Sequence, residues 1–164
     1  MKRAWIAMVV VVFSANLAVA QERVSLITLD GLEKRLFNGG DTTFVVNFWA
    51  TWCAPCVAEM PHFEKLQQHY QSKPLRVLFV SLDARKYQDA VLNFVNAKGL
   101  KNEVLILDER DEQYFIPQIS AEWSGAIPAT LFVNTGKGVR IFKEQEFDYQ
   151  QLERNYLSIV QQNQ

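Results

Sequence analysis

Cys53 and Cys56 are the only cysteines in this chain of 164 residues, and two residues separate them. Such a pair can close a small disulfide or supply two metal ligands, so the spacing alone leaves both chemistries open. An apolar run over residues 44–49 and a short turn precede the pair, and a helical pattern begins at the cysteines. Unpaired backbone N–H groups and the helix dipole stabilise a thiolate at a helix N-terminus, which lowers its pKa. The pattern predicts a reactive thiol at Cys53.

Redox exchange explains the pair better than metal binding or structural stabilisation. A zinc site with four ligands needs two more soft ligands, and the chain has no third cysteine and no paired histidine spacing. A disulfide across two residues closes a very small loop, whereas long loops give the largest stabilisation in the entropy model. Cys53 is the expected nucleophile and Cys56 the resolving thiol. The two cysteines would form a redox-active disulfide, and no metal or cofactor is expected.

The surrounding sequence resembles the thioredoxin superfamily in its active-site segment, Phe48-Trp49-Ala50-Thr51-Trp52-Cys53-Ala54-Pro55-Cys56. The following Glu59-Met60-Pro61 is similar to envelope thiol-disulfide oxidoreductases of the TlpA/ResA type. The resemblance extends from about residue 26 onward. It implies an α/β thioredoxin fold, a central mixed sheet flanked by helices. It also implies a helix–strand insertion, residues 86–107, before the hairpin that follows the cis-proline.

The periodicity of the chain predicts the same alternation of strands and helices. Asp30 is expected to cap the first helix, with Glu33 as its capping-box partner. Asp148 is expected to cap the last helix. The predicted strands span residues 24–29, 44–49, 75–82, 104–107, 129–133 and 139–142, and the predicted helices span residues 30–37, 53–70, 87–98, 111–120 and 148–159.

Two polar residues near the cysteines are candidates for proton transfer. Glu59 lies three residues after Cys56, on the same helical face. Its carboxylate could act as general base when the mixed disulfide is resolved, and the alternative is a solvated helix glutamate. Asn47 occupies the position of a buried acid in thioredoxin, but an amide cannot carry a proton. We expect Asn47 to be a hydrogen-bonded core amide.

A second group of residues is expected to bind the substrate. By resemblance, Pro128 follows a cis peptide bond and lies beside the cysteines, and backbone groups of Ile127 pair with an extended substrate. The alternative is an ordinary trans proline at a strand start. Trp52 and Pro55 are expected to contact substrate beside the cysteines. Trp49 is expected in the core, and Trp123 either lines the groove or belongs to the core or a surface loop.

The amino-terminal residues resemble a secretory signal peptide. A basic start, Met1-Lys2-Arg3, precedes an apolar stretch that ends at Ala18-Val19-Ala20. This pattern predicts cleavage before Gln21, leaving one thioredoxin-like domain over residues 21–164. The apolar stretch is short for a membrane span, and an uncleaved anchor is the alternative. Two of the 17 basic residues lie in this segment and none of the 18 acidic residues does, so acidic residues outnumber basic ones in the rest of the chain. The remainder is mildly acidic and has no basic run, which argues against nucleic acid as a partner.

These observations predict an exported thiol-disulfide oxidoreductase of the periplasm or cell envelope. The resemblance implies that it reduces disulfides in exported proteins, for example during cytochrome c maturation, with a membrane thiol reductant as electron donor. The membrane itself would be a partner only if the signal segment stays attached. A thiol-based copper chaperone is an alternative, because a dithiolate suits Cu(I). A peroxiredoxin-like peroxidase fits less well, since Val46 and Ala50 occupy its proline and threonine positions.

Overall fold

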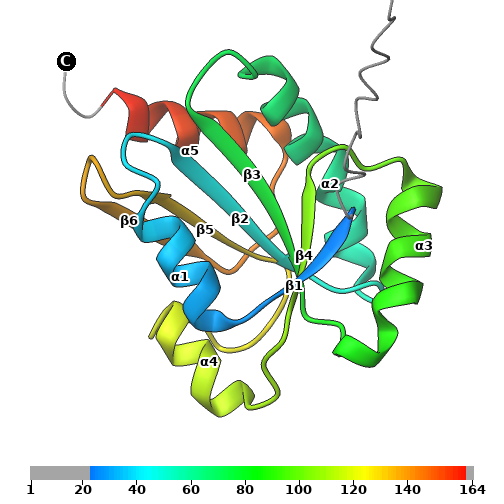
Figure 1. Ribbon diagram of the computed structural model, residues 1–164. Helices are drawn as coiled ribbons and strands as arrows, with labels where there is room; N and C mark the ends of the chain where they lie inside the picture. Colours follow the sequence, from blue (N-terminus) through cyan, green and yellow to red (C-terminus); the bar gives the residue numbers. More distant parts are fainter. Residues whose placement is uncertain (1–22, 162–164) are drawn as a thin grey trace, which may run out of the picture.

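The computed structural model describes residues 23–161 (Figure 1), so the predicted signal segment lies outside the described residues. None of the helices in the described range combines the length and apolar character needed to cross a lipid bilayer. The elements in chain order are β1 (Val24–Ile27), α1 (Leu29–Phe37), β2 (Thr43–Trp49), α2 (Ala54–His69), β3 (Leu75–Ser81), η1 (Arg85–Tyr87), α3 (Gln88–Lys98), β4 (Glu103–Leu107), α4 (Glu112–Ile119), β5 (Ala129–Asn134), β6 (Val139–Lys143) and α5 (Tyr149–Val160).

A single six-stranded sheet, in the order β1-β4-β3-β2-β5-β6, forms the centre of the domain. Strands β1 to β4 pair in parallel, whereas β5 and β6 are antiparallel to their neighbours. The sheet is therefore mixed, as predicted. Helix α3 and strand β4 form the expected insertion, and β4 lies between β1 and β3. The thioredoxin fold with this insertion is confirmed.

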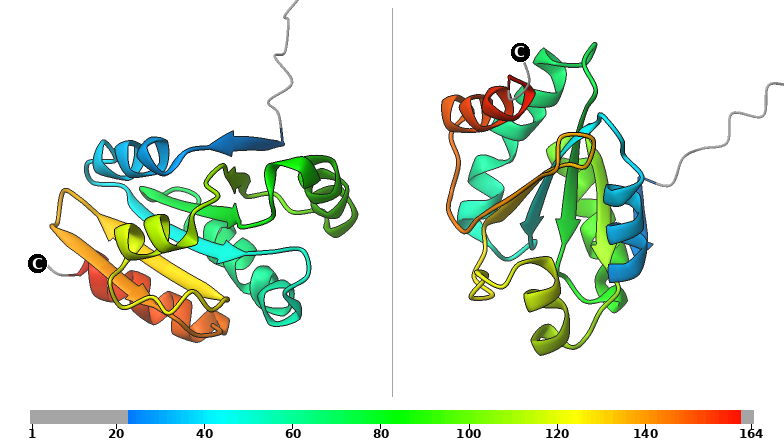
Figure 2. Two further views of the ribbon diagram at one scale, coloured as in Figure 1. Left: turned by 90° about the horizontal axis from the view of Figure 1, so that it is seen from below. Right: turned by 90° about the vertical axis from the view of Figure 1, so that its left-hand side faces the viewer.

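Helices cover both faces of the sheet (Figure 2). Apolar residues of α2, α3 and α5 form one core cluster on one face, and those of α1 and α4 form a second cluster on the other. Strand β2 is buried along its whole length between these clusters. Its side chains alternate between the faces, so that Val45 and Trp49 lie on the α2 side whereas Val46 and Phe48 lie on the α1 side. Asn47 shares the alternation of Val45 and Trp49 and faces α2.

The first helix begins earlier than predicted. Its N-cap is Thr28, whose side chain accepts a hydrogen bond from the Gly31 backbone N–H, so the prediction of Asp30 as the cap is wrong. Asp30 lies in the first turn instead, where a negative charge is favourable beside the helix N-terminus. Asp148 does cap α5, with Gln151 completing a capping box.

The topology brings several loops to one edge of the sheet. The parallel strands β2, β3 and β4 all end at this edge, and the antiparallel β5 begins there. Loops at the carboxyl ends of parallel strands are the usual location of functional sites in open α/β sheets. The cysteines follow β2 and Pro128 precedes β5, so the fold brings together two segments that lie far apart in the sequence.

Candidate active site

The cysteines form a disulfide at the first turn of α2. The sulfur atoms are 2.02 Å apart and the two Cα atoms 5.3 Å apart. Cys53 is the N-cap residue of α2, and its Sγ accepts a hydrogen bond from the Cys56 backbone N–H at 3.3 Å. This amide is one of the N–H groups that a helix leaves unpaired at its start. It is placed to stabilise negative charge on Cys53 once the disulfide is reduced.

The two cysteines differ in their exposure to solvent. Cys53 is only 6% exposed and Cys56 is fully buried. Cys53 is therefore largely covered by the residues around it. Cys53 is still the only one of the two with any exposed surface. An incoming thiol or disulfide can reach Cys53, whereas Cys56 can react only with its neighbour.

A buried carboxylate holds the turn between β2 and the cysteines. Asp83 accepts hydrogen bonds from the Thr51 backbone N–H and from Thr51 Oγ1, each at 2.8 Å. Ser81 Oγ donates a third bond to the same carboxylate at 2.7 Å. Asp83 is 5% exposed, so these bonds satisfy a carboxylate that has lost most of its water. The turn that presents Cys53 is thus tied to the end of β3.

The loop before β5 lies against the disulfide. The Ile127–Pro128 peptide bond is cis, as predicted, and the Ile127 carbonyl oxygen lies 3.8 Å from Cys53 Sγ. Ala126, which precedes Ile127, is held in place because Trp123 Nε1 donates a hydrogen bond to its carbonyl oxygen at 2.8 Å. The structure therefore brings Ile127 and Pro128 to the reactive sulfur.

The tryptophans separate into exposed and buried positions. Trp52 is 73% exposed, and Pro55 is also exposed, so both form surface beside Cys53. Trp49 is fully buried, as predicted. Trp123 is 5% exposed, and its ring contacts Phe48 with the centroids 4.9 Å apart. Of the three roles considered for Trp123, the structure supports the core role, because the residue is buried within a core cluster.

Glu59 is buried and hydrogen-bonded, and it is not a solvated helix residue. It is 2% exposed. Asn47 Nδ2 donates to Glu59 Oε1 and the Phe147 backbone N–H donates to Glu59 Oε2, both at 2.7 Å. Burial raises the pKa of Glu59 from 4.5 to about 7, although the bonds from Phe147 and Asn47 oppose this rise and the charge of Glu146 adds to it. Glu59 can therefore gain or lose a proton near neutral pH.

Asn47 is well placed to serve both protonation states of Glu59. Its Nδ2 donates to the ionised carboxylate and lies 3.4 Å from Thr130 Oγ1. Its Oδ1 is buried and accepts no hydrogen bond from another described residue. Rotation of the amide would bring Oδ1 to Glu59, where it could accept a bond from the protonated carboxyl group. The core amide predicted for Asn47 is confirmed, but its partnership with Glu59 was not predicted.

Glu59 also borders the surface. Together with His62, Glu146 and Gln151 it lines a hollow of about 400 Å³ between α2 and the start of α5. A proton on Glu59 can exchange with solvent through this hollow. The route does not cross the surface around Cys53, where a substrate would bind.

Several residues of the site were not predicted from the sequence. Asp83, Ser81, Thr51 and Phe147 act through hydrogen bonds between elements that are distant in the chain. The one available signal was the polar pair Ser81 and Asp83 at the end of an apolar strand, where parallel strands carry functional loops.

Comparison with known protein families places the chain among thiol-redox proteins. Residues 11–155 match the Redoxin family, and the first ten of these residues fall within the predicted signal segment. The chain is 46% identical over 61 residues to the thiol-disulfide oxidoreductase ResA of Bacillus thuringiensis (strain Al Hakam), a match covering 37% of this chain and 34% of ResA. It is 34% identical over 115 residues to the thioredoxin-like protein YneN of Bacillus subtilis (strain 168), covering 70% of this chain and 63% of YneN.

Solved structures show the same fold. A thiol:disulfide interchange protein of the thioredoxin family from Chlorobium tepidum TLS superposes with a TM-score of 0.61 at 20% identity, covering 82% of this chain and 90% of that one. A secreted thiol-disulfide isomerase from Corynebacterium glutamicum gives a TM-score of 0.60 at 20% identity, covering 74% and 72%. The resemblance to TlpA/ResA-type proteins, expected from the active-site segment, is confirmed by these relatives. The family match covers most of the chain, which belongs to the Redoxin family.

Proposed function

We propose that this protein is a thiol-disulfide oxidoreductase that reduces disulfides in exported proteins. The observation that carries the proposal is the asymmetry of the Cys53–Cys56 pair at the start of α2. Cys53 keeps a small exposed surface and its Sγ accepts a hydrogen bond from a helix N-terminal N–H, whereas Cys56 is fully buried. The ResA and YneN relatives support the same chemistry.

The reaction proceeds by two exchanges of sulfur partners. The Cys53 thiolate attacks one sulfur of the client disulfide, which forms a mixed disulfide and releases one client thiolate. Cys56 then loses its proton and attacks Cys53 Sγ, which releases the second client thiolate and leaves the Cys53–Cys56 disulfide. The client gains two electrons and the protein loses two. An external thiol reductant, for which we propose a membrane protein of the envelope, restores the dithiol.

Glu59 is proposed as the proton acceptor for Cys56. It lies one helical turn beyond Cys56, and with a pKa of about 7 it is partly ionised at neutral pH. A base is most effective when its pKa lies near the working pH. The proton then leaves through the hollow beside His62 and Glu146.

The client is proposed to bind as an extended segment across the Ile127–Pro128 loop. The Ile127 carbonyl already lies beside Cys53 Sγ, and backbone pairing with this loop would hold the client disulfide next to the nucleophile. Trp52 and Pro55, which flank Cys53 closely in the sequence, contribute exposed apolar surface. Exported apocytochrome c is a proposed client class.

Export to the envelope is part of the proposal. It is supported by the basic and apolar pattern of residues 1–20. Sequencing the amino terminus of protein recovered from the envelope tests it, and the expected start is Gln21. An intact amino terminus in a membrane fraction would instead indicate an anchor.

The experiment that tests the proposed activity measures reduction of a disulfide-bonded peptide by the reduced protein. We expect one peptide disulfide to be reduced for each Cys53–Cys56 disulfide formed. Cys53→Ser should abolish the reaction, and Cys56→Ser should stop it at the mixed disulfide. Copper binding without any peptide reduction would favour the chaperone alternative.

A further inference from the structure

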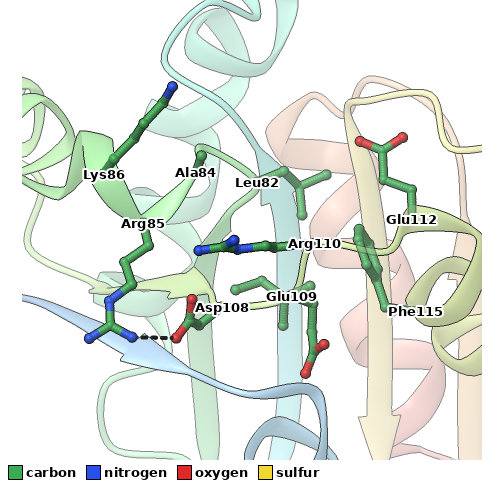
Figure 3. A pocket seen from close by; sticks show the side chains of 10 residues that line it. Leu82, Ala84, Arg85, Lys86, Asp108, Glu109, Arg110, Glu112 and Phe115 are labelled. Atoms are coloured by element: carbon green, nitrogen blue, oxygen red, sulfur yellow. Dashed lines mark hydrogen bonds and ion pairs between the residues drawn. The ribbon is translucent and has the colours of Figure 1, made fainter.

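The chain leaves the sheet in opposite directions after β3 and after β4. The segment after β3 leads to η1 and α3, which pack on the α2 face, whereas the segment after β4 leads to α4 on the α1 face. Such a divergence at the carboxyl ends of neighbouring parallel strands creates a crevice, and ligands of open α/β sheets bind in these crevices. A hollow of about 410 Å³ occupies this position (Figure 3). We call it the β3–β4 crevice; it is lined by Leu82, Ala84, Arg85, Lys86, Leu107, Asp108, Glu109, Arg110, Glu112 and Phe115.

Two of the three acidic residues that line the crevice already have partners. Asp108 pairs with Arg85 at 3.0 Å, and Glu109 Oε1 accepts a hydrogen bond from the Leu29 backbone N–H at 3.2 Å. Figure 3 shows the Glu112 carboxylate directed away from Arg110. Within residues 23–161, none of these three acidic residues forms an ion pair with Arg110.

Two cations that line the crevice, Lys86 and Arg110, form no ion pair within residues 23–161, but Lys86 points away from Arg110 (Figure 3) and its Nζ lies 4.9 Å from the centre of the Tyr87 ring. The Arg110 guanidinium extends from the β4–α4 loop into the hollow, below Ala84 (Figure 3). Within residues 23–161, the ion pairs involve Arg35, Arg85 and Arg140, but not Arg110. A guanidinium presents a planar set of donors that matches a carboxylate in two parallel hydrogen bonds. The crevice thus offers a carboxylate-binding group above an apolar floor that includes Phe115.

The crevice is joined to the reactive turn by direct bonds. Asp83, which lies between the lining residues Leu82 and Ala84, accepts two hydrogen bonds from Thr51, and the Leu82 backbone N–H donates to the Trp49 carbonyl at 2.8 Å. The ends of β2 and β4 are separated only by β3, or about 10 Å at the usual strand spacing. An extended polypeptide covers that distance in about three residues.

We propose that the β3–β4 crevice is a second binding site for the client, in which Arg110 binds an aspartate or glutamate about three residues from the client cysteine. The inference rests on the proposed function. The client segment on one side of its cysteine would follow the Ile127–Pro128 loop, and the segment on the other side would pass Thr51 and enter the crevice. The site therefore selects clients with an acidic residue flanking the disulfide.

Two disulfide-bonded peptides test this proposal. They are identical except for glutamate or glutamine at the third position from the cysteine. We expect the wild-type protein to reduce the acidic peptide with a kcat/KM about tenfold higher, as a charge-assisted contact implies. Arg110→Gln should abolish this preference, so that the variant reduces the two peptides with equal kcat/KM. Arg154→Gln is the matched control, because Arg154 is exposed on α5, away from the crevice. Equal kcat/KM values with wild type, or a preference that persists in Arg110→Gln, would overturn the proposal.

A binding measurement separates failure of the crevice from failure of the proposed function. Fluorescence anisotropy of the labelled peptides is followed with Cys53→Ser protein, which cannot react. Tighter binding of the acidic peptide that depends on Arg110, without turnover by the wild type, would support the crevice and contradict the oxidoreductase function. Turnover of both peptides without any preference for the acidic one would support the oxidoreductase function and contradict the proposed role of the crevice.

Discussion

Asn47 and Glu59 form a hydrogen bond in the core of the domain, with Asn47 Nδ2 donating to Glu59 Oε1 at 2.7 Å. The bond joins the central strand β2 to the helix that carries both cysteines. It places an ionisable carboxyl group inside the protein, where burial raises its pKa to about 7.

Replacing Glu59 with glutamine should slow release of the reduced client. The substitution keeps the shape of the side chain and removes the base, and the Asn47 amide can rotate to accept a bond from the new amide group. General-base catalysis typically contributes about a hundredfold or more, so the release step should slow by roughly that factor while mixed-disulfide formation changes little. Rapid-quench analysis of the two steps provides the measurement. Glu122→Gln, at an exposed position, is the control. An unchanged release step would show that Glu59 is not the proton acceptor.

The stability of the oxidised protein should fall as pH rises from about 4.5 to about 7. The unfolded chain loses the Glu59 proton near its ordinary pKa of 4.5, whereas the folded chain holds it to about 7. Between these pH values the folded state binds more protons than the unfolded state. The stability that the Glu59 proton contributes is therefore fully present below pH 4.5 and lost above about pH 7. The pKa difference corresponds to roughly 3 kcal/mol. Urea unfolding at both ends of the window measures it, and Glu59→Gln should lack this decline.

Asn47→Leu should move the pH dependence of client release to higher pH. The Asn47 bond stabilises the ionised carboxylate and so lowers the pKa of Glu59, which means that its removal raises that pKa above about 7. Because the base works in its ionised form, the midpoint of the rate profile should shift in the same direction. The release rate measured across this pH range checks the shift. A midpoint identical to that of the wild type would contradict the role given to Asn47.

The sequence was sufficient to predict the order of elements and the reactive pair, because these depend on local patterns. Phe44–Trp49 is continuously apolar apart from Asn47, and Cys53 follows it at a helix start, so strand, turn and nucleophile were all recognisable. The cis bond before Pro128 was predicted through resemblance and is present. The first helix cap was misplaced because Thr28 and Asp30 are both good capping residues and only the observed geometry distinguishes them.

The hydrogen-bonded partners in the site could not be predicted, because they depend on which face of the sheet each residue occupies. Alternation along β2 puts Asn47 on the same side as Trp49, but the sequence does not say that α2 covers that side. Nor does it place the Phe147 N–H, from the segment before α5, against Glu59. The burial of Glu59 follows from these long-range contacts.

Asp83→Ala should destabilise the protein and slow the first exchange step. The change removes the acceptor of two bonds from Thr51 and one from Ser81, and unpaired buried donors cost about 1–3 kcal/mol each. The turn that presents Cys53 would then lose its anchor to β3. Asp83→Asn should restore much of both properties, because an amide can accept from the Thr51 N–H and donate to its hydroxyl. Thermal unfolding and the rate of mixed-disulfide formation test the pair of variants. If Asp83→Ala reacts at the wild-type rate, the turn does not need this anchor.

The most direct test of the central claim is to identify the cysteine that bonds to the client. Reduced Cys56→Ser protein is mixed with a disulfide-bonded peptide, digested without reductant and mapped by mass spectrometry. Because Cys53 alone has exposed surface, we predict a stable adduct on Cys53, and no adduct with Cys53→Ser protein under the same conditions. An adduct on Cys56 in the Cys53→Ser protein, or no adduct on Cys53 in the Cys56→Ser protein, would contradict the assignment of nucleophile and resolving thiol.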